Sequence, residues 1–289
     1  MKNDMPLPQS AALSAHHVFL RYDKELVLND LNLEVPAGSV VGLVGRNGAG
    51  KSTLLRSFVG LAVPESGILS VLGDAGNRLT DSVRERLGYV PQQADLVDWM
   101  SVWQHVEYIG SFYNSWQFAK AQSLCQQLQL PLNPKVKSLS VGDKQKLAIV
   151  LALAHDPELV LMDEPVASLD PMMRRAFMQA IFDTQKQRTV LISSHLLADL
   201  ERIVSHVAFL REGRIQLVGG WDELAENLRI VSLPNDLPLL KSALTQRTAS
   251  QNSPSVRQAI VDTRLTVFTQ FADAVSAPTL DDLFVELNA

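Results

Sequence analysis

Short apolar runs alternate with segments of helical periodicity along most of this chain. Val40–Val44, Leu159–Met162 and Thr189–Ile192 are continuous apolar runs, which are typical of parallel strands buried on both faces. Between the last two runs, Asp170 and Pro171 supply a helix cap and a proline at the first helical position. The pattern therefore predicts an α/β fold with a mainly parallel sheet and connecting helices.

Alternating polar and apolar positions predict antiparallel strands near the start of the chain, after a tail over residues 1–16. His17–Arg21 and Leu31–Val35 alternate in this way, and a turn at Pro36–Gly38 follows them. A helix after Val40–Val44 is expected to run to about residue 59. Further strands are predicted at Ile68–Leu72, Leu87–Val90, Val207–Leu210 and Arg214–Leu217, the last two as a hairpin. The main domain is expected to span residues 17–220.

From Ser101 to about Leu130 the pattern is helical, and we expect a helical subdomain over about residues 95–140. Ser101 is placed to cap the first turn. The residues on its two apolar faces are Val102, Val106, Ile109 and Tyr113, then Leu124 and Leu128. Three of the four tryptophans, Trp99, Trp103 and Trp116, lie here and indicate either a partner surface or internal packing.

The tail over residues 221–289 has a different composition. Residues 231–258 are rich in Ser, Pro, Gln and Asn and contain few aromatic residues. Leu265–Thr269 is predicted to form a strand, and Leu280–Leu287 a short helix. We expect a small accessory domain that contains a flexible loop.

The composition limits the class of protein. The single cysteine, Cys125, excludes a disulfide framework and is compatible with a reducing cytosol. The net charge of −5 disfavours general binding to nucleic acid. The start of the chain lacks a secretion signal, and apolar runs such as Ala148–Ala154 are far shorter than the roughly 20 residues of a membrane helix. Any contact with a membrane is therefore expected to run through a partner.

A phosphate-binding loop follows the strand Val40–Val44. Gly45 and Gly50 bracket four residues ahead of Lys51 and Ser52, which is the spacing G-x-x-x-x-G-K-[ST]. Glycine lets the backbone approach phosphate oxygens closely, and the N-terminus of the following helix favours an anion. Lys51 would reach the β- and γ-phosphates, and the Ser52 hydroxyl would bind Mg²⁺. The predicted nucleotide-binding residues are Gly45, Arg46, Asn47, Gly48, Ala49, Gly50, Lys51, Ser52 and Thr53.

Two adjacent carboxylates, Asp163 and Glu164, follow the apolar run that ends at Met162. Ligands of open α/β sheets bind at this carboxyl edge. Asp163 can bind Mg²⁺ directly or through water, and Glu164 is placed to polarise an attacking water. A solvated Asp-Glu pair would be the better interpretation if no phosphate-binding loop preceded it.

A third segment, Lys137–Lys146, places Ser140 and Gly142 at the start of a predicted helix. A small hydroxyl and a glycine in this position can bind an anion. Taken alone, the segment indicates only a capped helix.

The order of these motifs resembles that of the ATP-binding-cassette ATPases. It runs from the phosphate-binding loop through Leu139-Ser140-Val141-Gly142 and Asp163-Glu164 to Ser168-Leu169-Asp170 and Ser194-His195. The resemblance covers about residues 17–220. It implies a P-loop NTPase fold with a RecA-like core, an antiparallel β subdomain and a helical subdomain. It also implies that two nucleotide-binding domains close head to tail, with ATP held between the phosphate-binding loop of one and the signature segment of the other.

The resemblance assigns roles to further residues. Tyr22 would stack on adenine, although a packed surface tyrosine is the alternative. Gln92, rather than Gln93, would contact Mg²⁺ and the attacking water and sense a transmembrane partner. His195 would contact the γ-phosphate or orient Glu164. Ser140 and Gly142 would touch the γ-phosphate of the partner's ATP, and Asp170 would order the dimer interface.

The signature segment departs from the family pattern Leu-Ser-Gly-Gly-Gln. Val141 replaces its first glycine and Asp143 its glutamine. An acidic side chain near a triphosphate should weaken closure if it points inward. Because Lys51, Asp163, Glu164 and His195 are intact, ATP hydrolysis is still expected.

The resemblance therefore implies the ATPase subunit of a membrane exporter, which uses ATP and Mg²⁺. Its expected partners are a transmembrane permease subunit and a second nucleotide-binding domain, identical or homologous, at the cytoplasmic side of the membrane. The segment Pro278–Phe284 resembles the closing helix of exporter-type cassettes, although any amphipathic helix would fit. The alternatives are a cassette ATPase outside transport and a regulatory partner that binds ATP but hardly hydrolyses it.

Overall fold

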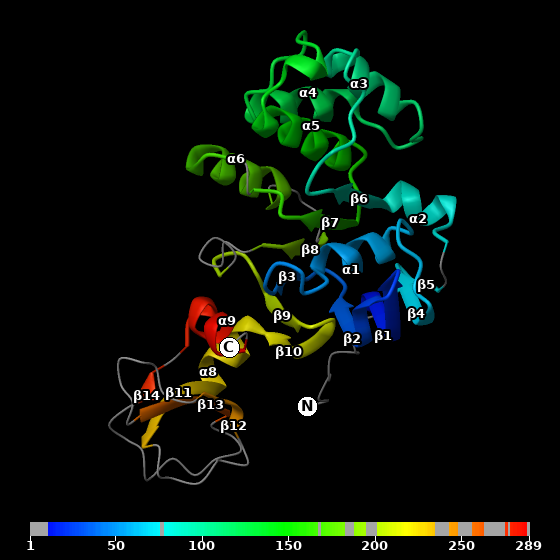
Figure 1. Cartoon of the computed structure of the whole chain (residues 1–289). Helices are drawn as coiled ribbons and strands as arrows, with labels where there is room; N and C mark the ends of the chain where they lie inside the picture. Colours follow the sequence, from blue (N-terminus) through cyan, green and yellow to red (C-terminus); the bar gives the residue numbers. More distant parts are fainter. Residues whose placement is uncertain are drawn as a thin grey trace, which may run out of the picture.

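A six-stranded sheet lies at the centre of the molecule (Figure 1). The structure, a computed structural model, describes residues 11–75, 78–166, 169–182, 188–194, 201–234, 243–247, 256–262, 275–276 and 278–287. All neighbouring strands of the sheet are parallel except the hairpin pair β10 and β9. From edge to edge the strands are β10 (Arg214–Gly220), β9 (His206–Arg211), β3 (Val40–Val44), β8 (Thr189–Ser193), β7 (Leu159–Asp163) and β6 (Leu87–Val90). The strands predicted from the apolar runs are confirmed.

Both faces of this sheet are covered, which explains why its strands are continuously apolar. Val160 and Met162 of β7 pack in one core with helices α5 (Val141–Leu153) and α6 (Pro171–Phe182). Leu159 and Leu161 point the other way and share a second core with helix α1 (Lys51–Phe58). Since neither face of β7 meets water, apolar residues stabilise both sets of positions.

An antiparallel sheet shares the second core with α1. Its hairpin pairs Leu13 with Val35 and Val18 with Leu31, as the alternation predicts. The two hairpin strands are longer than predicted, because the pairing runs from Ala11 and Pro36 to Tyr22 and Glu25. In sheet order the strands are β2 (Glu25–Pro36), β1 (Ala11–Tyr22), β4 (Ser66–Val71) and β5 (Asp74–Ala75), and the short helix α2 (Asp81–Arg86) precedes β6.

The helical part lies beyond β6 and contains two helices where the periodicity indicated one segment (Figure 1). They are α3 (Val102–Gly110) and α4 (Phe118–Gln127). Ser101 caps α3 as predicted and forms a capping box with Gln104. The indole of Trp116 packs against Gly110, the last residue of α3, where a Cβ atom would lie 2.7 Å from Nε1 of Trp116. The 3₁₀ turn η1 (Val136–Ser138) then leads to α5.

The three tryptophans of this part divide between the two interpretations. Trp103 and Trp116 pack against the core, and Nε1 of Trp103 donates to Glu107 Oε1 at 2.8 Å. Trp99 is 66% exposed. Internal packing therefore explains two of them, whereas Trp99 remains available to a partner.

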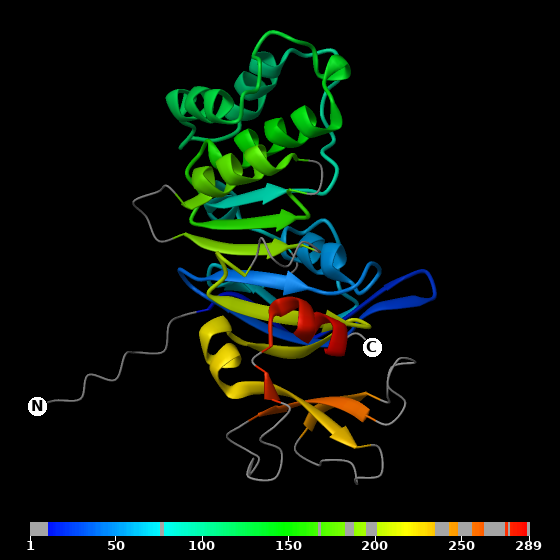
Figure 2. The ribbon, with the colours of Figure 1, turned by 90° about the vertical axis from the view of Figure 1, so that its left-hand side faces the viewer.

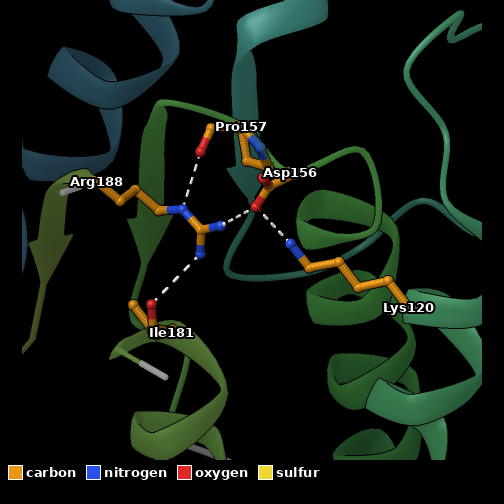
Figure 3. Close-up of polar contacts among 5 residues, drawn as sticks. All are labelled: Lys120, Asp156, Pro157, Ile181 and Arg188. Carbon is orange, nitrogen blue, oxygen red and sulfur yellow. Dashed lines mark hydrogen bonds and ion pairs between the residues drawn. The ribbon is translucent and has the colours of Figure 1, made fainter. Parts of the chain in front are cut away.

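A buried ion pair fastens the helical part to the central sheet (Figure 3). Asp156 follows α5 and accepts hydrogen bonds from Lys120 of α4 and from Arg188, just before β8. Arg188 is 4% exposed and also donates to the carbonyl oxygens of Pro157 (2.9 Å) and Ile181 (3.4 Å). Asp156 and Arg188 together thus join segments from α4, α5, α6 and β8.

The chain after β10 forms a separate small sheet. Helix α8 (Trp221–Asn227) leads from Gly220 into antiparallel strands, in the order β12 (Ala243–Arg247), β13 (Val256–Asp262), β11 (Leu228–Pro234) and β14 (Val275–Ser276). β12 lies within the stretch 231–258 that is rich in Ser, Pro, Gln and Asn, and β11 and β13 overlap its two ends. The strand predicted at Leu265–Thr269 lies outside the described residues.

The predicted C-terminal helix is confirmed as α9 (Leu280–Leu287), and it returns to the central sheet (Figure 2). Leu280, Leu283 and Leu287 are buried in the same core as β9. The backbone oxygen of Leu287 accepts a hydrogen bond from Arg211 of β9 at 3.2 Å. Helix α9 therefore stabilises β9, the neighbour of the strand β3 that leads into the phosphate-binding loop.

Candidate active site

The predicted phosphate-binding loop curls from the end of β3 into α1. Gly48 (φ 82°) and Gly50 (φ 108°) have left-handed backbones, which suit glycine. A Cβ atom at Gly45 would lie 2.4 Å from the carbonyl oxygen of Leu210. The loop therefore needs its glycines for close packing as well as for curvature.

Lys51 is buried at the first position of α1, with its ammonium group inside the loop. Its Nζ donates to the carbonyl oxygens of Gly45 (2.7 Å) and Arg46 (3.2 Å). Burial lowers the pKa of Lys51, while the charges of Glu164 and Asp163 act in the opposite direction. The loop thus holds a buried cation beside the place predicted for the β- and γ-phosphates.

The two predicted carboxylates end β7 beside this loop, and both are buried. Glu164 has a left-handed backbone (φ 49°), an unfavourable conformation for a non-glycine residue. Its Oε1 lies 3.8 Å from Nζ of Lys51. The strained turn therefore brings the predicted general base to the phosphate-binding loop.

Ser193 positions both carboxylates, and the sequence did not single it out. Its hydroxyl donates to Oδ1 of Asp163 at 2.8 Å and accepts from the backbone N–H of Glu164 at 3.0 Å. Ser193 ends β8, the neighbour of β7, and pairs with Asp163 across the sheet. A polar residue at the end of an apolar strand was the available signal.

A cavity of about 360 Å³ opens over the loop and brings together residues far apart in the sequence. Tyr22, at the end of β1, is 47% exposed and faces it from one side, and Gln92 faces it from the loop after β6. Glu25 and Val27 of β2 also line it and were not predicted. The other residues around it are Arg46, Asn47, Gly48, Gly50, Lys51, Ser52, Thr53 and Glu164.

The signature segment does not line this cavity. Ser140 caps α5, and Gly142 lies in the first turn of that helix. Val141 is 72% exposed, so the segment faces outward. The amide of the buried Gln145 in α5 donates to the carbonyl oxygen of Pro91 at 3.3 Å, next to Gln92. The helix that carries Ser140 thus contacts the loop that carries Gln92.

Of three further residues in the predicted motifs, the structure describes only Asp170. His195 and Ser168 lie outside the described residues, so the role of His195 stays a prediction. Asp170 is exposed and caps α6, because its Oδ1 accepts from the backbone N–H groups of Met172 (2.9 Å) and Met173 (3.0 Å). Its predicted role in a dimer interface stays a prediction too.

Comparison with known proteins identifies the family. A family profile described as "ABC transporter" matches residues 28–167. The chain is 32% identical to the Nod factor export ATP-binding protein I of Cupriavidus metallidurans, over 75% of this chain and 74% of that protein. The chain belongs to the ABC transporter family. It is the ATP-binding subunit, an ATPase, as the sequence predicted.

Solved structures agree with this assignment of the ABC cassette. One, titled "Structure of ATP binding subunit of ABC transporter", is 28% identical with a TM-score of 0.67, over 74% of this chain and 92% of that one. Another, titled "Structure of a bacterial Atm1-family ABC exporter with ATP bound", is 25% identical with a TM-score of 0.66, over 74% of this chain and 40% of that one. The predicted fold class is therefore confirmed. Among the described helices of the cassette, none has the length and apolar character needed to cross a bilayer.

Proposed function

We propose that two copies of this cassette close head to tail around MgATP and power export by a membrane partner. The supporting observation is that the residues predicted to bind one nucleotide lie on two separate surfaces. Lys51 and Glu164 line the cavity, whereas Ser140 lies outside it at the outward-facing start of α5. A second copy would supply the missing surface, and reciprocal contact would complete two equal sites.

The residues beside the cavity fit a magnesium ion. Oδ2 of Asp163 is buried and has no hydrogen-bond partner within the described part of the chain. An unpaired buried carboxylate oxygen is costly unless a cation or water satisfies it. We propose that Asp163, Ser52 and Gln92 hold Mg²⁺, directly or through water, because hard oxygen ligands suit this ion. The ion would neutralise charge on the β- and γ-phosphates.

Tyr22 and the phosphate-binding loop would hold the rest of the nucleotide. An exposed aromatic ring at the cavity edge can stack on adenine, which would contribute about 1–3 kcal/mol. Glu164 would polarise the attacking water, and Lys51 would stabilise the γ-phosphate charge. His195 would contact the same phosphate from the segment after β8.

A groove of about 350 Å³ offers a place for the membrane subunit. It lies between the end of α1, strand β6 and helix α3, and Leu61, Tyr89, Ile109 and Tyr113 are among its lining residues. Leu61 is 70% exposed, so an apolar side chain is available to a partner at the groove. We propose that an apolar segment of the membrane subunit packs here, at the cytoplasmic side of the membrane. The name of the Cupriavidus metallidurans relative supports export as the direction of transport.

The decisive experiment removes the general base. Glu164→Gln should abolish turnover and convert the purified protein from monomer to dimer when MgATP is added, measured by analytical ultracentrifugation. Unchanged hydrolysis in this variant would overturn the assignment of Glu164, and a persistent monomer would overturn head-to-tail closure. Co-purification with a membrane subunit from detergent-solubilised membranes separates an exporter from an ATPase outside transport.

A further inference from the structure

At the start of α5, Asp143 stands where the family pattern has glutamine, and it forms hydrogen bonds with Ser140. The hydroxyl of Ser140 donates to Oδ2 of Asp143 at 2.8 Å and accepts from the backbone N–H of Asp143 at 3.1 Å. A serine hydroxyl has only one proton to donate. In this structure Ser140 therefore donates its one hydroxyl hydrogen bond to Asp143, so this hydrogen bond is not available to a phosphate oxygen.

The carboxylate of Asp143 is itself held in place. Nζ of Lys146 donates to its Oδ1 at 3.0 Å, and the Lys146 side chain is 13% exposed. Burial raises the pKa of Asp143, but the hydrogen bonds from Lys146 and Ser140 outweigh this and lower the pKa overall. The group is therefore a charged acceptor at neutral pH, and hydrogen bonds to charged acceptors are stronger than those between neutral groups.

We infer that Asp143 is a positioning residue that restrains the Ser140 hydroxyl and so lowers the affinity with which the cassette dimer closes over ATP. The inference rests on the proposed function, in which Ser140 contacts the γ-phosphate held by a second copy. Closure must redirect the hydrogen bond of the Ser140 hydroxyl from the Asp143 carboxylate to a phosphate oxygen and bring two negative groups together. A neutral amide at position 143 would oppose neither step as strongly.

Dimer affinity in the Glu164→Gln background tests the inference, because hydrolysis does not then obscure closure. With MgATP present, adding Asp143→Asn should tighten the dimer about fivefold, which is the effect expected for exchanging a charged hydrogen-bond acceptor for a neutral one. Asp98→Asn is the matched control: it removes an equal charge from a carboxylate that pairs with the side chain of Lys144 (3.5 Å) rather than with the Ser140 hydroxyl. It should leave the dimer affinity unchanged.

A double-mutant cycle separates positioning from simple charge repulsion. If Asp143 acts through the hydroxyl, the gain from Asp143→Asn disappears when Ser140→Ala is also present. A gain of equal size in the Ser140→Ala background would overturn the inference, and so would an unchanged or weaker dimer with Asp143→Asn alone. A merely structural cap would change the melting temperature and leave the dimer affinity unaltered.

A second variant covers the case in which Asp143→Asn does not fold. Lys146→Met removes the cation that shares Asp143, so the carboxylate should hold Ser140 more firmly and the dimer should weaken at least threefold. Tighter or unchanged dimers with this variant would contradict the inference. If the Glu164→Gln protein does not dimerise at all, the proposed function is overturned and the inference with it. If it dimerises but neither Asp143→Asn nor Lys146→Met changes the dimer affinity, only the inference is overturned.

Discussion

Nζ of Lys51 lies 3.8 Å from Oε1 of Glu164, although Lys51 begins α1 and Glu164 follows the end of β7. Lys51 also donates to two carbonyl oxygens of its own loop, so the cation stabilises the loop in addition to its proposed role in binding the nucleotide. Lys51→Met should therefore lower both ATP affinity and the free energy of unfolding, the latter by about 1–3 kcal/mol. Thermal unfolding with and without MgATP checks both effects. A variant that ATP still stabilises as much as the wild type would contradict this role of Lys51.

Ser193 gives a prediction about turnover. Removing its hydroxyl leaves the buried Asp163 with one fewer donor and the Glu164 backbone with one fewer acceptor. Ser193→Ala should lower kcat about tenfold, equivalent to roughly 1.4 kcal/mol, with little change in KM, because the nucleotide is bound mainly by the loop. Ser39→Ala is the matched control, since it also removes a buried hydroxyl, at the start of β3, that donates to Pro36. A fall in kcat of equal size in the control would show that the effect is general destabilisation.

The contrast between Ser193 and Lys51 shows what the sequence could predict. Lys51, Asp163 and Glu164 lie within short local motifs, and the apolar runs that become β3, β7 and β8 are readable because both faces of the sheet are buried. Ser193 meets Asp163 only through the register of two strands that a helix separates in the chain. Such a pairing depends on tertiary structure, which no local pattern specifies.

The same reason explains the other differences. The packing of Trp116 against Gly110 is a tertiary contact that the periodicity does not show, and the strands from Leu228 onward depend on pairing with one another rather than on composition. The Ser140–Asp143 contact, by contrast, spans one helical turn, and the sequence pointed to Asp143 as a departure. The sequence left open whether the carboxylate points inward, towards a triphosphate, and did not predict its hydrogen bond with Ser140.

The buried pair between Arg188 and Asp156 should make a large contribution to stability (Figure 3). Arg188→Met removes three hydrogen bonds from a buried site and leaves Asp156 with Lys120 alone among the cations drawn. We expect the free energy of unfolding in urea to fall by about 3 kcal/mol. Arg188→Lys should rescue little, because a single ammonium group cannot reach three acceptors in a plane. Arg84→Met breaks an exposed pair with Asp81, so its effect should stay below about 1 kcal/mol. Equal losses in the two methionine variants would contradict the prediction.

His155 should make the protein sensitive to mild acid. Its ring stacks on Tyr113 and is 2% exposed, and burial lowers the pKa of His155 to about 4, with Lys120 and Arg188 adding to the effect and Leu87 and Glu85 opposing it. The unfolded chain binds a proton near the ordinary pKa of about 6.5. Stability is therefore complete above that pH and falls as the pH drops towards 4, by up to about 1.4 kcal/mol per pH unit.

Replacing the ring tests this dependence. His155→Phe keeps an aromatic ring against Tyr113 but cannot bind a proton, so its unfolding free energy should vary less between pH 6.5 and 5 than that of the wild type. His16→Asn removes a histidine from the exposed surface and should keep the wild-type slope. Urea unfolding at several pH values measures both. Parallel curves for wild type and His155→Phe would show that other groups cause the acid sensitivity.

The groove beside α1 leads to a prediction about the membrane partner. Leu61 is 70% exposed and lines the groove, so Leu61→Asp should disrupt an apolar contact there without disturbing the core. We expect this variant to lose most of its co-purification with the membrane subunit while the ATPase activity of the isolated cassette stays unchanged. Ile68→Asp places the same charge on an exposed apolar residue of β4, outside the groove, and should leave co-purification intact. Normal recovery of the membrane subunit with Leu61→Asp would mean that the partner binds another surface, and the exposed Trp99 of the helical part would then be the first place to look.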